Sequence, residues 1–418
     1  MAQVSAFNHL KQQDFPENFR FYFKNKSRQT EQHDLQSLQA LVRPKLKIVI
    51  VTETWPPEIN GVALSLLQLC KGLQKQGHKI LLIRPQQKQR CTQFVPNKEC
   101  LVLAQSIKFG WPQFLKVSHA IEDFEPDVVH IVTEGPLGMA ALQVAKNKKI
   151  PISSGFHSAF QDFSRFFDLA FLVKPIQRYL CWFHNNTQLT CVPSQDTAHS
   201  LQALGVNCPM AVVGRGVDVE CFHPQYASAQ LRRRWGADDQ TTVLLYVGRL
   251  SPEKEVDVII QAYIALQKSN QQKTLLVIVG DGPEATKLKH LSAQNKVIFT
   301  GSLSGTRLSE AYASADVFVF ASQVETFGNV VLEAMASGLA VVAYDRACAH
   351  QYVKHQQSGW LCAVGDTTSF MRQIQQLPQR EVLKHMGKNA QQDIQDVGWQ
   401  RPVQQFEQAL YSATRVIL

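Results

Sequence analysis

The stretch that most constrains the fold is residues 324–338, which read V-E-T-F-G-N-V-V-L-E-A-M-A-S-G. A short apolar run, residues 317–321, comes before it, and another, residues 339–343, follows it. Runs of this length are typical of buried strands, and Gly338 is placed to end a helix between them. The order of strand, glycine-containing loop, helix and strand predicts one βαβ unit of a parallel sheet.

The junction of loop and helix in this unit suits a diphosphate, because free backbone N–H groups and the positive end of the helix dipole converge there. Its two carboxylates, Glu325 in the loop and Glu333 in the helix, are eight residues apart and cannot share one short helical face. A carboxylate near a diphosphate is repulsive unless it accepts hydrogen bonds from hydroxyl groups, which sugars supply. The spacing alone fits an ordinary βαβ unit with one exposed and one partly buried glutamate equally well.

Composition narrows the class of protein and of partner. The chain has 418 residues, 45% hydrophobic and 18% charged, which is typical of a globular protein long enough for two domains. Nine scattered cysteines, without a C-x-x-C pair or a His/Cys cluster at metal spacing, favour a reducing compartment and argue against a metal site. Neither an apolar run of membrane-spanning length nor a signal-peptide pattern occurs, so we expect a cytoplasmic protein.

The formal net charge of +9 indicates an anionic partner. Nucleotide phosphates, an anionic membrane surface and nucleic acid all carry the required charge. Nucleic acid is the least favoured, because the basic residues are dispersed and form no known binding module.

Successive strand and helix patterns predict two α/β domains. We expect an extension at residues 1–44, a first domain at residues 45–206, a second at residues 207–398 and a final helix within residues 399–418. The run at residues 189–193 is expected to be the last strand of the first domain.

Two smaller elements are assigned to the second domain. The short run at residues 211–213 is expected to be a strand of that domain, and residues 358–365 are expected to form a hairpin or loop.

Two segments mix aromatic and basic residues. Residues 15–26 fit either a membrane interface or a packing arm, and residues 163–184 fit either an acceptor-facing or membrane-facing surface or the packing of helices around the core. A peripheral position on the inner face of a membrane is therefore compatible with the sequence.

Further candidate site residues follow predicted strands. In the first domain, Gly61 lies at a strand–helix junction, where the absence of a side chain lets a phosphate approach the backbone, and His157 lies just past a strand end. In the second, Arg249 and Lys254 flank an expected helix start with Ser251 as its N-cap. Two cations beside a helix N-terminus suit a diphosphate. The alternatives are a plain turn at Gly61, a structural histidine at His157 and two solvated surface charges at Arg249 and Lys254, and the last is disfavoured by the placement of the two cations after a strand.

Taken together, five motifs resemble the family 4 retaining glycosyltransferases. The resemblance covers residues 46–415, in the family's order and spacing, and leaves the extension outside. The motifs are V-E-T-F-G-N-V-V-L-E-A-M-A-S-G, Y-V-G-R-L-S-P-E-K, V-G-D-G-P-E, T-E-T-W-P-P-E-I-N-G-V and G-F-H-S-A-F.

This resemblance implies a GT-B architecture, in which two Rossmann-like doubly wound domains face each other across a cleft and the last helix crosses back to the first domain. It implies transfer of a hexose from a nucleotide-diphosphate sugar with retention of configuration, without a metal ion. The nucleotide sugar would be a co-substrate, and no cofactor is expected. The branch it resembles most comprises GDP-mannose-dependent α-mannosyltransferases and diacylglycerol glycosyltransferases, which implies a lipid or glycan acceptor.

Roles for individual residues come from the same resemblance. Arg249 and Lys254 would hold the diphosphate and stabilise the leaving group, Glu325 would bind the donor sugar, and Glu333 would bind the ribose. His157 would contact the sugar near its reacting end. The nucleobase of the donor would lie near Gly301 and Ser302. The remaining expected contacts with the ligand come from glycines and backbone amides: Gly61, Gly301, Phe327, Gly328, Asn329 and Val330.

Three alternatives stay open at this point. A relative in the same family could use a UDP-sugar to make a glycolipid. A GT-B enzyme of another kind, such as a nucleotide-sugar epimerase or a phosphorylase, could share these motifs. A non-catalytic protein could bind the nucleotide sugar without transferring it.

Overall fold

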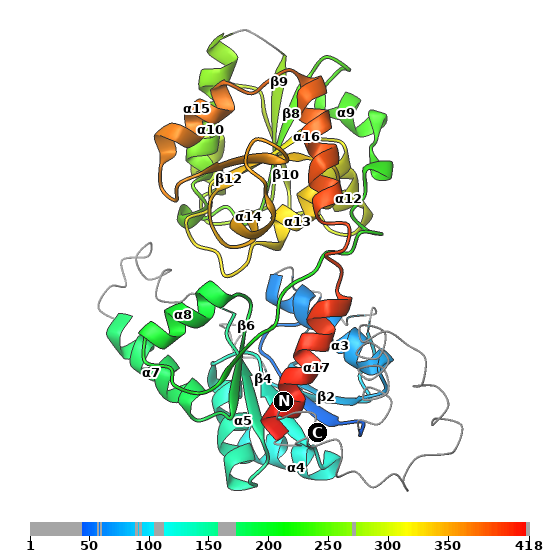
Figure 1. Cartoon of the computed structure of the whole chain (residues 1–418), viewed down its shortest axis with the longest axis vertical. Coiled ribbons are helices and arrows are strands. Elements are labelled where there is room, and N and C mark those ends of the chain that lie inside the picture. The colour runs from blue at the N-terminus through cyan, green and yellow to red at the C-terminus, as the bar shows by residue number, and fades with distance from the viewer. Residues whose placement is uncertain are drawn as a thin grey trace, which may run out of the picture. The chain divides into compact units, whose positions relative to one another are not determined.

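The computed structural model describes residues 44–56, 58, 61–87, 91, 94–103, 113–157, 173–269 and 273–414. Its strands form two parallel sheets flanked by helices (Figure 1), which confirms the expectation of two Rossmann-like α/β domains. Apart from residue 44, the expected extension at residues 1–44 lies outside the described residues. The same holds for residues 163–172 of the aromatic segment.

The first sheet has seven parallel strands in the order β3-β2-β1-β4-β5-β6-β7. In chain order they are Lys47–Val51 (β1), Lys79–Pro85 (β2), Lys98–Val102 (β3), Val128–Ile131 (β4), Ile152–Gly155 (β5), Leu189–Val192 (β6) and Met210–Val212 (β7). The central strands are short apolar runs because both of their faces are covered.

Two pairs of helices cover the two faces of this sheet. Ile48 and Ile50 of β1 pack in one cluster with side chains of α3 (Gly61–Lys75) and α17 (Gln400–Thr414). The alternate residues Val49 and Val51 pack in a second cluster with α4 (Phe114–Phe124) and α5 (Pro136–Asn147). The final helix therefore packs on the first sheet beside α3 (Figure 1), as the resemblance implied. Two further helices of this half of the chain are α7 (Val173–Asn185) and α8 (Gln195–Ala203).

One strand belongs to a different sheet than expected. The run at residues 211–213 forms β7, which pairs in parallel with β6 in the first sheet, so the assignment of this strand to the second domain was wrong. The expectation that residues 189–193 are the last strand of the first sheet was wrong for the same reason. A three-residue strand carries no local pattern that identifies its partner, and the pairing follows from where the chain leaves α8.

The second sheet has six parallel strands in the order β10-β9-β8-β11-β12-β13. They are Thr242–Val247 (β8), Thr274–Val279 (β9), Val297–Gly301 (β10), Val317–Phe320 (β11), Ala340–Tyr344 (β12) and Gly359–Cys362 (β13). The helices of this domain are α9 (Ala229–Trp235), α10 (Val256–Ser269), α11 (Ala285–Leu291), α12 (Thr306–Ala313), α13 (Asn329–Ala336), α14 (Ala347–Tyr352), α15 (Thr367–Gln375) and α16 (Arg380–Asp393), with 3₁₀ turns at Pro224–Tyr226 (η3) and Pro252–Lys254 (η4).

The βαβ unit predicted around residues 324–338 is present as β11, α13 and β12. The hairpin or loop expected at residues 358–365 is instead the edge strand β13, parallel to β12. Gly359 makes this pairing close, because a Cβ atom there would lie 2.2 Å from the carbonyl oxygen of Val341.

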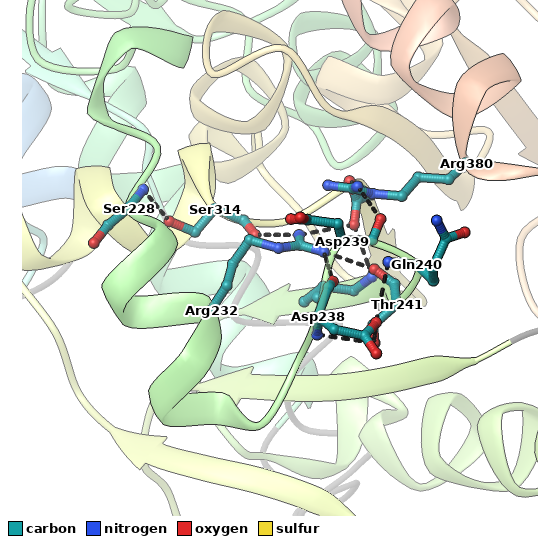
Figure 2. Close-up of polar contacts among 10 residues, drawn as sticks. Ser228, Arg232, Asp238, Asp239, Gln240, Thr241, Ser314 and Arg380 are labelled. Atoms are coloured by element: carbon teal, nitrogen blue, oxygen red, sulfur yellow. Dashed lines mark hydrogen bonds and ion pairs between the residues drawn. The ribbon is translucent and has the colours of Figure 1, made fainter.

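A buried ion-pair network lies in the second domain at the amino ends of the strands β8 and β11 (Figure 2). The Asp316 carboxylate accepts from Arg232 Nη1 at 3.0 Å and from Arg380 Nε at 2.7 Å. It also accepts from the backbone N–H of Val243 at 2.9 Å, and its side chain is only 3% exposed. The network joins α9, α16 and the starts of two central strands, at the edge opposite to their carboxyl ends.

Both sheets reverse their strand order at one place, between β1 and β4 in the first and between β8 and β11 in the second. In open α/β sheets, ligands bind outside the carboxyl ends of the strands at such a switch point. A ligand site is therefore expected at the loops that follow β8 and β11.

Candidate active site

Lys254 and Glu325 meet at the switch point of the second sheet. Lys254 lies in η4 after β8, Glu325 lies in the loop after β11, and the ammonium group forms an ion pair with the carboxylate. The same ammonium group donates to Ser322 Oγ at 3.1 Å and to the carbonyl oxygen of Val324 at 3.3 Å. Its three donors are thus all used, and the two side chains are only 14% and 16% exposed. The sequence predicted both residues but did not predict that they pair.

The turn that presents Lys254 differs from the expected helix start. Ser251 occupies the N-cap position of η4, yet its hydroxyl donates to the Glu253 carboxylate at 2.5 Å and caps no backbone N–H. Ser251 therefore holds the predicted N-cap position, but of a 3₁₀ turn and without a capping hydrogen bond, and the helix α10 begins only at Val256. The buried carboxylate of Glu253 competes for the hydroxyl, and the result is a single 3₁₀ turn with Lys254 at its end.

Arg249 is the second cation of this group. It lies two residues past the end of β8, is exposed, and its guanidinium makes no hydrogen bond or ion pair with any described residue. Its backbone is held, because the hydroxyl of the buried Tyr246 donates to the Arg249 carbonyl at 2.8 Å. A fixed backbone with an unoccupied planar guanidinium suits recognition of an oxyanion.

The α13 N-terminus adds backbone donors next to this pair. Gly328 is its N-cap with φ +87°, a left-handed conformation that favours glycine, and no side chain caps the first turn. The buried Phe327 precedes it, and the half-buried Asn329 and Val330 open the helix. The first N–H groups of such a helix are available to an anionic ligand.

Glu333, one turn into α13, is a partly buried carboxyl group. Burial raises its pKa to about 7, and a hydrogen bond of 2.9 Å from the Tyr312 hydroxyl lowers the pKa in part. The two glutamates therefore have different partners: Glu333 accepts from a tyrosine hydroxyl, and Glu325 pairs with a lysine.

We expect this carboxyl group to make stability depend on pH. Because its folded pKa of about 7 exceeds its ordinary value of 4.5, the folded protein keeps a proton that the unfolded chain loses, and stability falls as pH rises through that window. Ionised Glu333 should cost up to about 3 kcal/mol above pH 7, since one pKa unit corresponds to about 1.36 kcal/mol.

The test compares the melting temperature of wild type and Glu333→Gln at about pH 5 and pH 8. Wild type should lose more stability than the variant between the two values, because glutamine cannot ionise. Parallel behaviour of both proteins would show that Glu333 titrates normally.

Two glycines of the predicted site have open space where a side chain would be. A Cβ atom at Gly61 or at Gly301 would contact nothing within 4 Å. Packing within the protein therefore does not explain why residue 61 is glycine. At Gly301 the backbone conformation favours glycine, because φ is +71°. Gly301, at the end of β10, and Gly248, just after β8, both lie at the carboxyl ends of the strands. Gly280 connects them, because its N–H donates to the Gly301 carbonyl and it packs directly on Gly248.

The first sheet contributes His157, two residues past the end of β5. Its Nδ1 accepts a hydrogen bond of 2.9 Å from Arg215 Nη2. Burial, with Arg215 as the second cause, holds the pKa of His157 well below its usual range. Arg215 was missed by the sequence interpretation, although a basic residue between two glycines directly after a strand was a usable signal.

Glu53 is a second residue whose place the sequence did not reveal. Its carboxylate accepts from the Leu137 N–H at 2.9 Å, at the N-terminus of α5, and a Cβ atom at Gly135 would collide with it. The helix end at the switch point of the first sheet is thus already occupied by a carboxylate. An anion is disfavoured there, in contrast to the α13 N-terminus.

No group of three His, Cys, Asp or Glu side chains within the described ranges is arranged to hold a metal ion. In the same part of the chain, no helix combines the length and the apolar character needed to cross a membrane.

Comparison with known proteins identifies the family. The family model described as Glycosyltransferase Family 4 matches residues 59–221, and the model described as Glycosyl transferases group 1 matches residues 228–393. A GDP-mannose-dependent alpha-mannosyltransferase of Mycobacterium tuberculosis is 32% identical over 332 residues, which cover 77% of this chain and 85% of the relative.

Two further proteins extend the comparison. An alpha-monoglucosyldiacylglycerol synthase of Streptococcus pneumoniae is 28% identical over 333 residues, covering 76% of this chain and 75% of the relative. The crystal structure of HepE from Anabaena, in complex with UDP and glucose, superposes with a TM-score of 0.69 at 20% identity and covers 89% of this chain and all of that one. The GT-B fold is thereby confirmed. The chain belongs to the family 4 glycosyltransferases, with a group 1 glycosyltransferase domain as its second half.

Proposed function

We propose that the protein transfers mannose from GDP-mannose to a lipid or glycan acceptor with retention of the α configuration, using no metal ion and no cofactor. The observation that carries the proposal is the pairing of Lys254 with Glu325 at the switch point, beside the uncapped N-terminus of α13. The mannosyltransferase relative supports this choice of donor and sugar.

In the proposed site, the diphosphate lies against the α13 amides between Arg249 and Lys254. Arg249 donates hydrogen bonds to it, whereas Lys254, whose three N–H groups are already used, acts through its charge, and the two cations take the role that a metal ion has elsewhere. Glu333 accepts hydrogen bonds from the ribose, Glu325 from the sugar, and His157 contacts the sugar near its anomeric carbon. Gly61 and Gly301 leave room for the ligand.

The acceptor hydroxyl attacks the anomeric carbon on the side of the leaving group. The bond between that carbon and the diphosphate oxygen breaks, a bond to the acceptor oxygen forms, and the departing phosphate oxygen takes the hydroxyl proton. Its ion pair with Lys254 makes Glu325 a poor covalent nucleophile, which supports front-face attack over a glycosyl-enzyme intermediate.

Donor choice is tested by thermal shift with GDP, UDP and ADP, because a ligand that binds the folded form raises its melting temperature. GDP should give the largest rise. A larger rise with UDP would favour the second candidate, a UDP-sugar-dependent glycolipid synthase, which the glucosyldiacylglycerol synthase relative motivates. An unchanged melting temperature with all three nucleotides would contradict the proposed nucleotide site.

A peripheral position on the cytoplasmic face of an anionic membrane is part of the proposal. Leu103, Phe114 and Leu115 are exposed near the start of α4, with the exposed Lys116 beside them, on a chain of net charge +9. Apolar side chains next to a cation suit the interface of an anionic bilayer. The protein should float with phosphatidylglycerol vesicles at low salt, and Leu115→Glu should weaken this. Absence of flotation would remove the membrane from the proposal.

A further inference from the structure

Arg215 is a buried cation without a carboxylate partner in the described part of the chain. The residue is 7% exposed, and the hydrogen bond of its Nη2 atom goes to His157 Nδ1 at 2.9 Å. Burial lowers its pKa to about 10, so the guanidinium stays charged at neutral pH. Buried charges are normally paired with an opposite charge, and a bond to an imidazole in place of a carboxylate therefore needs an explanation.

The direction of this hydrogen bond fixes the proton on His157. A guanidinium donates and never accepts, so Nδ1 must carry a lone pair, and the single proton of the neutral imidazole must be on Nε2. Nε2 makes no hydrogen bond with any described residue. The ring lies directly over Gly155, where a Cβ atom would come within 2.4 Å of Nε2.

We propose that Arg215 is a positioning residue that holds His157 in the neutral form protonated on Nε2, so that His157 meets the donor sugar as a hydrogen-bond donor and not as a proton acceptor. The role toward the sugar rests on the proposed function, whereas the tautomer is a property of the protein alone. His157 is thereby excluded as the base, which agrees with a mechanism in which the departing phosphate oxygen takes the proton.

The backbone around Arg215 is held on both sides, so that the guanidinium is presented in one place. The N–H of Gly214 donates to Gln405 Oε1 of α17 at 3.0 Å, and the N–H of Val217 donates to the carbonyl of Val397 at 3.0 Å. Gly216 between them packs against Gly398, where a Cβ atom would lie 2.6 Å from the backbone.

The charges around His157 support a neutral ring. The described titratable groups that act on it are Arg215, His130 on β4 and His184 on α7, and all three disfavour the protonated form. Burial lowers the pKa of His130 to about 3, so that histidine is neutral as well. Glu134, 3.3 Å from His184 Nε2, is directed at His184. A protonated His157 would place a second positive charge beside a buried guanidinium.

The test compares wild type with Arg215→Met, which cannot donate, and with Arg215→Lys, which can donate but cannot accept. In the first measurement, nitrogen NMR of ¹⁵N-histidine-labelled protein without substrate reports which ring nitrogen of His157 carries the proton, with His157→Gln to assign the signals. Wild type and Arg215→Lys should be protonated on Nε2, and Arg215→Met should give a mixture. A wild-type ring protonated on Nδ1, or an unchanged ring in a folded Arg215→Met, would overturn the proposal.

The second measurement follows sugar transfer from about pH 5.5 to about pH 8.5, the range in which an unperturbed histidine titrates. Wild type should have no acidic limb from His157. Arg215→Met should lose roughly tenfold in kcat with a smaller change in KM, and should acquire an acidic limb that Arg215→Lys lacks, because lysine keeps a positive charge beside the ring. Gly155→Ala, which displaces the ring and leaves the cation, should lower kcat without this limb. A rate loss in Arg215→Met that leaves the pH profile and the tautomer unchanged would make Arg215 merely structural. If no donor is turned over, the proposed function fails while the tautomer result stands.

Discussion

Replacing Lys254 by alanine is expected to lower kcat/KM for the nucleotide sugar by about 10²-fold to 10³-fold, the usual effect of removing one preorganised group that stabilises developing negative charge. Lys254 has two tasks in the proposed site. It faces the charge that develops on the departing diphosphate, and its ion pair holds the Glu325 carboxylate in place. Its three hydrogen bonds fix it in the absence of ligand, so no ordering is needed during the reaction.

The matched control for Lys254→Ala is Lys273→Ala. Lys273 also pairs with a carboxylate, Asp238, but the pair is exposed and lies where β9 begins, at the opposite edge of the sheet. Its loss should leave turnover unchanged. Glu325→Gln separates the two tasks, because it keeps Lys254 but removes the paired charge. If Lys254→Ala folds and turns over at the wild-type rate, the role assigned to Lys254 is wrong.

Replacing Asp316 by asparagine is expected to destabilise the second domain by about 3 to 5 kcal/mol, the cost of leaving buried charges without their partner. Two partly buried arginines, Arg232 and Arg380, converge on this one carboxylate, which also accepts from the N–H of Val243 at the start of β8. Asparagine preserves the volume, but it has one acceptor oxygen and no charge for the two guanidinium groups.

Urea unfolding, monitored by circular dichroism, measures this loss of unfolding free energy, and Asp123→Asn is the control. Asp123 pairs with Lys98 at 3.5 Å on the surface, and its side chain is 69% exposed, so its loss should change stability by less than about 0.5 kcal/mol. Well below the melting temperature, Asp316→Asn should keep its kcat, because the network lies away from the carboxyl ends of the strands. Similar stability of the two variants would contradict the importance of the network.

The sequence predicted the central strands and the βαβ unit around Glu325, because short apolar runs buried on both faces leave a clear local pattern. Edge elements were predicted less well. The strand Lys98–Val102 was not expected, since it begins with two exposed charged residues and is half covered. The strand Gly359–Cys362 was taken for a hairpin or loop, because its pairing depends on a glycine that allows close approach to Val341.

The candidate site, too, was predicted only in part. Individual residues such as Lys254, Glu325 and His157 were found from their positions after strands, but their partners were not. Lys254 and Glu325 are 71 residues apart, and His157 and Arg215 are 58 apart. Each pair is brought together only by the strand order of its sheet, which local sequence does not encode.

The central claim, retaining transfer of mannose at the site of Lys254 and Glu325, is tested most directly by the configuration of the product. GDP-mannose is incubated with the protein and with phosphatidylglycerol vesicles that carry dioleoylglycerol, and proton NMR follows the anomeric signals of the lipid product and of mannose released to water. The α-anomer should form first in wild type, and Lys254→Ala should slow its formation. A β-anomer as the first product, or an α-anomer formed equally fast by Lys254→Ala, would contradict this claim.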